Sequence, residues 1–376
     1  MHVHLSRREA LGLMAAGLSG CVLPAVANPA RFTDQDYRKA MVIDAQGGFD
    51  RQLSMDRTAA ATEESGLTAI SLTMGLVGNG VRRFESVLED IADANGWIQQ
   101  YPEAFMPVLR ASDLAAAKKS GRTGFIYNIQ DTSSLEGDIS RVTLLKNLGV
   151  RIMQLTYNKR NLCGDGCLES ENAGLSDFGH QVVAQINASR MLLDLSHGGR
   201  RTISEAARAS KVPPAVTHTA CRDLVDNQRN MYDDQMREIA DRGGVVGIYF
   251  IAYLRSGIGQ PALNARREDL IAHLEHAVNV CGEDHVGIGT DGSVSTLTID
   301  EQTLANQKKR FEERTKQGFA TAGEGPDVFN YVQGYNSPRR LFTLAEDLSQ
   351  RGWPAARIEK IIGGNFARLF TAAWDA

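Results

Sequence analysis

The fold of this chain is indicated most directly by residues 191–218, which read MLLDLSHGGRRTISEAARASKVPPAVTH. Two short apolar runs, Met191–Ser196 and Ala215–Thr217, flank a stretch with amphipathic helical spacing. Within that stretch residues 202–205 (TISE) have the form of a capping box, which predicts that a helix begins there. A histidine follows each apolar run directly. Strand, helix and strand in this order are typical of a parallel sheet.

The same alternation of strand and helix extends over the rest of the chain. Eight apolar runs can be recognised, and their near-continuous apolar character is expected for strands buried on both faces of a parallel sheet. Amphipathic segments separate the runs; one of them begins after Ser176 and another ends at Gly282. Eight strand–helix units predict an α/β fold, namely a (β/α)8 barrel. An open doubly wound sheet is the alternative, but no G-x-G-x-x-G segment follows the first run. The runs are Met41–Ala45, Leu67–Thr73, Gly124–Ile129, Arg151–Thr156, Met191–Ser196, Ala215–Thr217, Val245–Phe250 and Val286–Thr290.

The composition is that of a globular protein. The chain has 376 residues, of which 43% are hydrophobic and 23% are charged, and its net charge is −4. These values exclude a disordered chain, a coiled coil and a protein with many membrane spans. The lack of a basic excess argues against a nucleic-acid binder. We expect a single barrel domain over residues 28–376, with insertions at 75–122 and 292–340. The charged run 306–317 in the second insertion predicts a solvated helix.

The first 27 residues predict an export signal. Residues 6–11 (SRREAL) resemble a twin-arginine motif around Arg7 and Arg8, and an uncharged stretch rich in Ala, Gly and Leu follows. An A-x-A cleavage site ends at Ala27, and residues 18–21 (LSGC) resemble a bacterial lipobox, in which Cys21 would be lipidated. We therefore expect the protein in the periplasm or otherwise exported, either released or held by a lipid anchor at Cys21.

Two of the remaining cysteines lie close together in the sequence. Cys163 and Cys167 form a C-x3-C pair in a glycine-rich loop. In an oxidising compartment this pair closes a small disulfide, and otherwise it holds two unpaired thiols. A zinc ribbon is excluded because no second pair of Cys or His residues lies nearby.

The candidate metal-binding and catalytic residues directly follow the predicted strands. In barrels of this kind the active site lies at the C-terminal ends of the strands. His197, His218 and Asp291 each occupy such a position on a different strand. Imidazole nitrogens and a carboxylate are typical ligands of zinc. Because a metal ion with an open coordination position activates water and polarises a carbonyl, these three residues predict a metal-dependent hydrolase.

The other histidines after the signal do not share that position. His180 and His276 fall on the polar faces of their helices, and His273 lies at the edge of an apolar stripe. His285 precedes a strand and so lies at the opposite end of the barrel. We assign structural or solvated roles to all four.

At these residues the chain resembles the membrane dipeptidase (renal dipeptidase) family of zinc metallopeptidases. The resemblance covers almost all of the chain after the signal and is densest from Gly124 to Asp291. Each matching segment is weak alone, but together they are specific. The resemblance implies a barrel of the metal-dependent hydrolase type with a two-metal site. The segments are Thr156–Asn158, Gly174–Gly179, Asp194–His197, Thr217–Thr219, Arg229–Asn230, Gly287–Asp291 and Gly363–Asn365.

The resemblance also implies roles for individual residues. His197 and His218 would bind one metal ion, and Asp291 would contact the other ion or its water. In a hydrolase built on this site, we expect Asp291 to act as the general base. Arg229 would hold the carboxylate of the substrate, a task that suits the guanidinium fork. Tyr157 stands where many family members have a histidine that contacts the substrate.

The chain departs from the family pattern at the other metal position. Gln46 and Gly48 replace a His-x-Asp pair, and Gln130 replaces a glutamate that bridges the two ions. A neutral amide oxygen is a poor zinc ligand, and two ions ~3.5–4 Å apart need a bridging anion. Asp131 does not compensate, because a shift of one residue along a strand turns the side chain to the other face.

We therefore expect one zinc ion, held by His197, His218 and Asp291. A second ion would have only Gln46 and Gln130, both of them weak ligands.

Three classes of function follow from this site. The favoured one is an exported metallodipeptidase-like hydrolase that cleaves a dipeptide or small amide by metal-activated water. The second is a non-peptidase one-metal hydrolase, which acts on a lactone or an N-acyl amino acid or matures a secreted peptide. The third is a catalytically inactive binding protein. The expected partner is a small peptide or amide substrate, and we consider a homodimer; no nucleic acid is expected.

Overall fold

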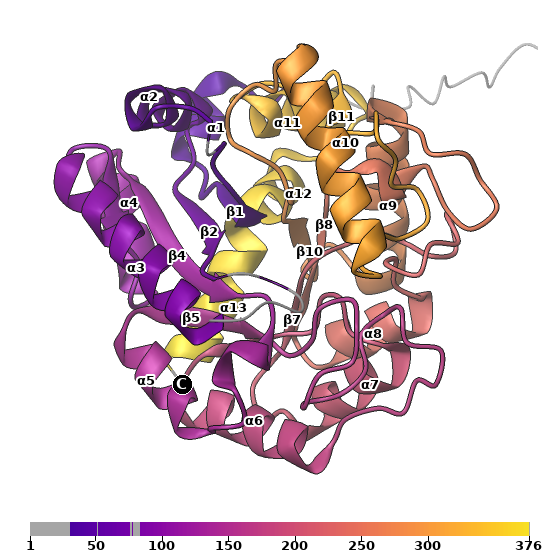
Figure 1. Cartoon of the computed structure of the whole chain (residues 1–376). Coiled ribbons are helices and arrows are strands. Elements are labelled where there is room, and N and C mark those ends of the chain that lie inside the picture. The colour runs from indigo at the N-terminus through magenta and orange to yellow at the C-terminus, as the bar shows by residue number, and fades with distance from the viewer. Residues whose placement is uncertain (1–30, 51, 76, 78–82, 376) are drawn as a thin grey trace, which may run out of the picture.

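A computed structural model describes residues 31–50, 52–75, 77 and 83–375, and the statements below refer to these residues. The predicted export signal, including Cys21, lies outside them. Eight parallel strands follow one another around a barrel in chain order (Figure 1). All eight predicted runs are confirmed as strands, with ends within two residues of those expected. The strands are β1 (Ile43–Gly47), β2 (Ala69–Thr73), β4 (Thr123–Ile129), β5 (Val150–Gln154), β6 (Leu192–Asp194), β7 (Ala215–Thr219), β8 (Val245–Ile248) and β10 (Val286–Ile288).

The barrel closes between β10 and β1 through residues at and just beyond the C-terminal ends of these strands. The backbone N–H of Asp291 donates to the carbonyl of Gln46 at 2.7 Å. Gly48 then donates to the carbonyl of Gly292 at 3.0 Å, and Val294 donates back to Gly48 at 2.9 Å. The two strands are not paired along their length in the sheet. The seam is therefore held at the C-terminal end, where the candidate site lies.

Helices surround the strands as expected for this fold (Figure 1). The predicted helix after Ser176 is confirmed, since the hydroxyl of Ser176 caps it. The helix that ends at Gly282 is also confirmed. The helices in this outer layer are α2 (Met55–Ser65), α5 (Ser140–Asn147), α6 (Asp177–Ala188), α7 (Arg200–Ala209), α8 (Asp233–Asp241), α9 (Arg267–Cys281) and α11 (Arg340–Gln350).

The predicted capping box at residues 202–205 is wrong. Helix α7 begins at Arg200, one residue after its N-cap Gly199. The hydroxyl of Thr202 instead accepts the backbone N–H of Asp165 at 3.1 Å. The carboxylate of Glu205 accepts the N–H of Leu175 at 2.8 Å. Both side chains therefore hold the long loop after β5 rather than the end of their own helix.

The interior of the barrel has an apolar layer below a polar layer. The apolar layer packs against helix α13 (Asn365–Trp374), which lies behind the strands in Figure 1. Two residues further along the same strands the side chains are buried but polar, because side chains two apart point to the same side of a strand. This change from apolar to polar positions the candidate site at the C-terminal end. The pairs are Ala69 and Ser71, Ile126 and Asn128, Ile152 and Gln154, Leu192 and Asp194, and Ala215 and Thr217.

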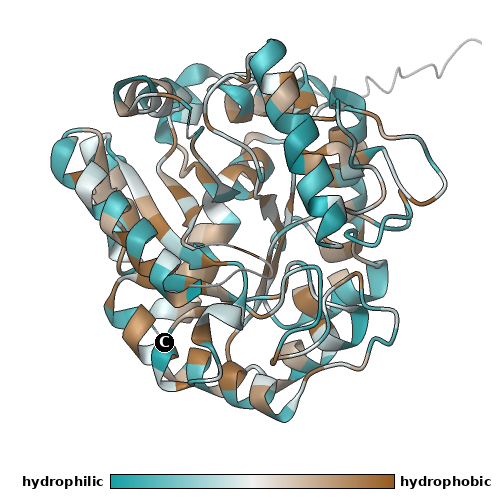
Figure 2. Cartoon of the chain, in the orientation of Figure 1, coloured by the Kyte–Doolittle hydropathy of each residue, from teal (hydrophilic) through white to brown (hydrophobic). Residues whose placement is uncertain are grey.

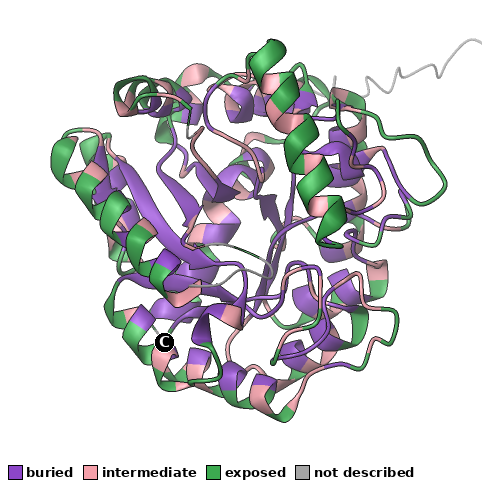
Figure 3. Ribbon diagram, viewed as in Figure 1, coloured by how far each residue is buried: buried purple, intermediate pink, exposed green. Residues whose placement is uncertain are grey.

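Two segments add structure beyond the basic barrel. Residues 83–120 form α3 (Arg83–Gln100), the short strand β3 (Phe105–Pro107) and α4 (Ser112–Ser120). After β10 comes α10 (Glu301–Lys316), which has no buried residue and is mostly hydrophilic and exposed (Figures 2 and 3). This confirms the solvated helix predicted at 306–317.

The remaining elements are short. In the part of the chain that the structure covers, every helix is too short or too polar to span a lipid bilayer. The short elements are α1 (Asp34–Lys39), α12 (Ala355–Glu359), the paired strands β9 (Ala265–Arg266) and β11 (Val332–Gln333), 3₁₀ turns at Thr132–Leu135 and Ala252–Leu254, and a π turn at Lys360–Gly364.

Candidate active site

The two predicted metal-binding histidines lie side by side. His197 follows β6 and His218 lies in β7, and their Nε2 atoms are 2.9 Å apart. Both side chains are buried. His197 has a φ of +62°, in the left-handed region that a residue with a side chain rarely adopts. The backbone is therefore bent at the residue that turns its imidazole toward its partner.

A buried carboxylate positions this pair. Asp194 Oδ1 accepts the backbone N–H groups of Ser196 at 3.0 Å and Thr217 at 2.9 Å, and Oδ2 accepts the Thr217 hydroxyl at 2.6 Å. These bonds join the end of β6 to β7 one residue before each histidine. We call this contact the Asp194 bridge. It fixes the separation of the two strands where the imidazoles meet.

Hydrogen bonds also define the tautomer of both rings. The amide nitrogen of Asn158 donates to the carbonyl of Phe319 at 2.8 Å, so its Oδ1 faces His197 Nδ1, 2.6 Å away. Because that oxygen only accepts, His197 Nδ1 carries the proton. The Thr217 hydroxyl gives its proton to Asp194, so its oxygen accepts from His218 Nδ1 at 2.8 Å. Both Nε2 atoms are then left with lone pairs directed at each other.

Two facing lone pairs require a proton or a cation between or beside them. Burial holds the pKa of both imidazoles well below the ordinary value, and the Arg229 guanidinium lowers both further. Protonation is therefore disfavoured, and neutral imidazoles with fixed Nδ1–H groups are what a divalent metal ion needs. The donor set of His197 and His218 fits a metal ion.

Asp291 lies in the wall of the same cavity as His197, Arg229 and Tyr157. It directly follows Thr290, and it too has a positive φ, +53°. Burial raises the pKa of its carboxyl, while Arg229 and two arginines of α10 act in the opposite direction. The raised pKa makes this carboxylate a stronger proton acceptor than an exposed aspartate.

Arg229 is a buried cation without a carboxylate partner among the described residues. Its side chain is only 4% exposed. One guanidinium nitrogen donates to the carbonyl of His218 at 2.8 Å, and the guanidinium lies 5.7 Å from the ring centre of Tyr249. The other N–H donors of the guanidinium are free to bind a ligand. An anion is the ligand that would stabilise this buried cation.

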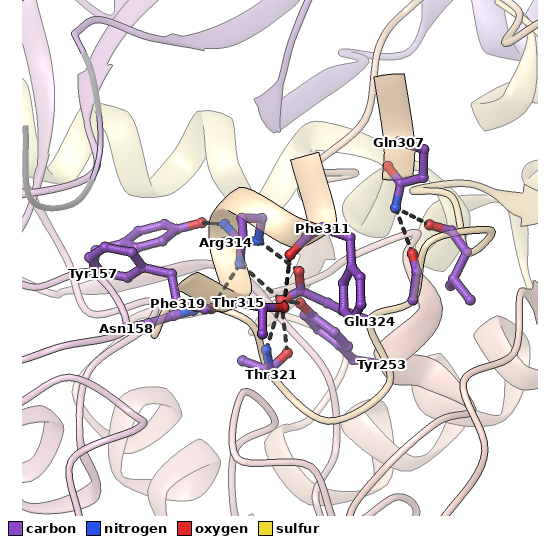
Figure 4. A network of polar contacts seen from close by, with 12 residues as sticks. Tyr157, Asn158, Tyr253, Gln307, Phe311, Arg314, Thr315, Phe319, Thr321 and Glu324 are labelled. Carbon is purple, nitrogen blue, oxygen red and sulfur yellow. Dashed lines mark hydrogen bonds and ion pairs between the residues drawn. The ribbon is translucent and has the colours of Figure 1, made fainter. Parts of the chain in front are cut away.

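Tyr157 and helix α10 complete the smaller cavity. The ring of Tyr157 stacks on His197 with 4.1 Å between ring centres. Arg314 of α10 donates to the Tyr157 hydroxyl at 3.4 Å and to the carbonyl of Phe319 at 3.0 Å. The same guanidinium pairs with Glu324 at 2.6 Å (Figure 4). The α10 helix is thus tied by polar contacts to the residues that surround the imidazole pair.

The residues expected at the other metal position form a neutral cluster. Gln46 Nε2 and Gln130 Nε2 each donate to the Thr73 hydroxyl oxygen at 3.0 Å. Asn128 donates to Gln46 Oε1 at 3.2 Å and to the Ser71 hydroxyl at 2.8 Å. We call Gln46, Thr73, Asn128 and Gln130 the amide cluster. It holds no carboxylate or imidazole, so these residues do not fit a second metal ion.

Gly48 and Asp131, the two other positions considered for a second metal ion, supply no ligand either. A Cβ atom at Gly48 would meet nothing within 4 Å, and no ligand side chain is present there. Asp131 turns away from the amide cluster: its Oδ1 accepts the N–H of Ser133 at 3.0 Å and the amide of Asn161 at 2.8 Å. Over the described ranges no three His, Cys, Asp or Glu side chains gather as a metal site would. The participation of Asp291 as a third ligand stays a prediction.

A cavity of about 790 Å³ opens beside the amide cluster. Gln46, Gln130, Tyr157 and Asp291 lie in its wall, so it adjoins the smaller cavity that contains His197 and Arg229. Its volume is within the range of about 300–1,000 Å³ that is usual for small-molecule sites. The candidate site is thus a two-part pocket at the C-terminal end of the barrel.

Sequence reasoning missed several residues of the site. Asn158 lies in a quoted segment, but its contact with His197 depends on the loop after β5. Thr73 and Asn128 lie at strand ends and become visible only when β1, β2 and β4 are known to be neighbours. Arg314 lies in a surface helix with no sequence signal of its own.

The cysteines and the other histidines have structural roles. Cys163 and Cys167 are both unpaired, so the structure favours the second of the two interpretations. His273 is buried and bonded to Cys221 N–H and the Leu254 carbonyl. His276 contacts Asp233, as a partly exposed helix residue.

The fold and the site define an α/β-barrel hydrolase with a pair of converging imidazoles. Comparison with known proteins gives the family. The sequence profile of the membrane dipeptidase family (peptidase family M19) matches residues 28–308. The chain belongs to this family of metallopeptidases, and the resemblance seen in the sequence is confirmed.

Individual relatives are more distant. An uncharacterized protein from the pqqA 5′ region of Klebsiella pneumoniae is 29% identical over 274 residues, 71% of this chain and 88% of that protein. Rat dipeptidase 3 is 25% identical over 289 residues, 75% of this chain but only 51% of the relative. The crystal structure of an amidohydrolase from Pseudomonas aeruginosa has a TM-score of 0.78 and 29% identity, and covers 91% of this chain and 99% of that one.

Proposed function

We propose that this protein is a one-metal amide hydrolase of the membrane dipeptidase family. The observation that carries the proposal is the pair of buried imidazoles whose Nε2 lone pairs converge, next to an amide cluster that lacks every anionic ligand. The family contains metallodipeptidases, which supports a small peptide or amide as the substrate. The substrate itself, and the number of metal ions, are part of the proposal.

The residues of the chain would act as follows. Arg229 binds the carboxylate of the substrate with the donors that no protein group uses. Asp291 takes a proton from the attacking water and returns it to the nitrogen of the leaving amine. The scissile C–N bond breaks, and a carboxylate and an amine are released. Tyr157 packs against His197 and keeps water from that side of the ring.

The metal ion belongs at His197 and His218. When bound there, a divalent ion such as zinc supplies Lewis-acid polarisation of the scissile carbonyl and lowers the pKa of water. The Asp194 bridge and Asn158 hold both imidazoles in the tautomer that this binding needs.

The test compares His197→Ala with His180→Ala. His180 is exposed on α6 and serves as the matched control. Metal content and amide hydrolysis are measured on a panel of dipeptides and N-acyl amino acids, before and after chelation and after zinc is restored. His197→Ala should lose the metal and at least about 100-fold of kcat/KM, and His180→Ala should keep both. Zinc-independent hydrolysis, or no hydrolysis of any amide by the zinc-loaded protein, would overturn the proposal.

We also propose that the protein is exported. This rests on residues 1–27 alone, with their twin-arginine motif and A-x-A site.

A further inference from the structure

The larger cavity has one distinctly apolar wall. Phe49, Leu72, Met74 and Trp97 line it from the side of β1, β2 and α3. The rings of Phe49 and Trp97 are in edge contact, with centres 6.0 Å apart. A cavity of about 790 Å³ is far larger than two small amino acids need. Leu72 and Met74 are only 5% and 4% exposed, whereas Phe49 and Trp97 are partly buried, so the two rings carry most of the apolar surface that a ligand would cover.

The amide cluster between this wall and the imidazoles offers no negative charge. Both amide nitrogens of Gln46 and Gln130 are used on Thr73. Gln130 is 7% exposed, and its Oε1 accepts no hydrogen bond from any described residue. Each amide nitrogen keeps a second N–H that Thr73 does not use, and the free Gln130 oxygen is a neutral acceptor. It suits the N–H of an amide, whereas a free ammonium group needs an anion when it leaves water.

The charged side chains that line the cavity are of both signs, two arginines and three aspartates. Arg340 is 7% exposed, donates to the backbone carbonyls of Val294 and Ser295, and forms no ion pair with a described residue. Arg310 also lines the cavity. Of the acids there, Asp90 accepts the N–H of Gly75 and Asp50 that of Gln52, so backbone groups fix the position of both carboxylates. Asp291 is the acid that shares the smaller cavity with His197.

We propose that the substrate is an N-acyl amino acid, whose apolar acyl chain lies along Phe49, Leu72, Met74 and Trp97 and whose carboxylate binds Arg229. The inference rests on the proposed function, since it names the substrate class of the same site. Water adds to the acyl carbon, the amide C–N bond breaks, and the products are a fatty or aryl carboxylate and a free amino acid. A dipeptide carries an ammonium group on the carbon next to that carbonyl and would place it against the neutral cluster.

A matched pair of compounds tests this. Octanoyl-alanine and 2-aminooctanoyl-alanine differ only in the α-ammonium group. Both are prepared with each enantiomer of alanine and given to the zinc-loaded protein. We expect kcat/KM to be at least tenfold higher for octanoyl-alanine, and higher for octanoyl-alanine than for acetyl-alanine. A preference for the aminooctanoyl compound, or for the acetyl compound, would overturn the inference.

The apolar wall is tested with variants of one helix. Trp97→Ala should reduce the octanoyl-to-acetyl ratio of kcat/KM about tenfold. Ile98→Ala on the same helix, outside the cavity lining, should leave that ratio within twofold of wild type. Equal ratios in wild type and Trp97→Ala would place the acyl chain elsewhere and contradict the proposal.

Binding separates this inference from the proposed function. In metal-free protein, octanoyl-alanine should bind at least tenfold more tightly than 2-aminooctanoyl-alanine, as measured by calorimetry. If it binds in this way but neither compound is hydrolysed with zinc, the pocket is as inferred and the hydrolase proposal fails. If dipeptides are hydrolysed and octanoyl-alanine neither binds nor reacts, the hydrolase proposal stands and the acyl pocket is wrong.

Discussion

Asp44 and Asp194 hold opposite parts of the barrel mouth in the same way. Asp44 Oδ1 accepts the N–H groups of Gln46 and Thr290, and Oδ2 accepts the Thr290 hydroxyl at 2.6 Å. Asp194 makes the same three bonds with Ser196 and Thr217. The residue after each threonine is a candidate catalytic group, Asp291 in one case and His218 in the other. Two equivalent carboxylates thus position the base and the imidazole pair.

Asp194→Asn should weaken metal binding without direct loss of a ligand. The amide cannot accept at both atoms, so the Thr217 hydroxyl loses its acceptor and the orientation of His218 is released. We expect zinc affinity to fall about 10- to 100-fold, measured by competition with a chromophoric chelator. Asp131→Asn is the control, since Asp131 is also a buried carboxylate but bonds to Ser133 and Asn161 rather than to a residue next to a proposed ligand. Equal losses of affinity in both variants would contradict the positioning role of Asp194.

Metal stoichiometry tests the amide cluster. Purified protein should hold about one tightly bound divalent ion per chain, because the lone pairs of His197 and His218 converge on one position. Elemental analysis after dialysis gives the number. His197→Ala and His218→Ala should each remove the ion while the circular dichroism spectrum stays that of the barrel. A value near two in wild type would show that the amides bind metal after all.

Restoring the family ligands should create a second metal position. The variant carries Gln46→His, Gly48→Asp and Gln130→Glu together. Gly48 has room for a side chain, since a Cβ atom there meets nothing within 4 Å, whereas one at Gly47 would lie 2.6 Å from Asp44. We expect close to two zinc ions per chain and increased hydrolysis of free dipeptides. Gly48→Asp alone provides the control for stability. If the triple variant folds and binds two zinc ions yet hydrolyses dipeptides no faster than wild type, that result would count against an ancestral dipeptidase activity.

His273 predicts a pH dependence of stability. Burial lowers its pKa to about 4, below an unfolded value of about 6.5. A histidine with a lowered pKa takes up a proton first in the unfolded state, so its contribution to stability is full above pH 6.5 and falls as the pH decreases. Between pH 6.5 and 5 the loss is about 2 kcal/mol. Urea unfolding gives the free energy of unfolding of metal-free wild type and of His273→Gln. The difference between the two should shrink by that amount as the pH falls over this interval. Parallel curves would rule out a neutral, buried His273.

Export is tested on the N-terminal segment. Replacing Arg7 and Arg8 with lysine should retain the protein in the cytoplasm, as measured by cell fractionation, because twin-arginine transport reads that pair. Cys21→Ala then separates a released protein from an anchored one: loss of membrane association would indicate lipidation at Cys21. Continued export of the lysine variant, together with a block when general secretion is inhibited, would show that the other route is used.

The sequence predicted the barrel well because strand burial is a local signal. Each strand coincides with a short apolar run, as β6 lies within the predicted run Met191–Ser196. The family resemblance placed Gln46 and Gln130 together, but Thr73 and Asn128 were not predicted, because they come from β2 and β4 and meet the glutamines only once the strand order is known. The capping box failed for the same reason, since Thr202 and Glu205 bond to a distant loop.

The seam between β10 and β1 links adaptation of the site to integrity of the fold. The last join of the barrel is made by the backbone of Gln46, Gly48 and Asp291, which also line the pocket. The loops that follow β10 and β1 therefore cannot change independently of each other during evolution. The loops that follow the other strands are free to do so. New specificities should arise more readily along α3 and α10, whose side chains reach the pocket without taking part in closing the barrel.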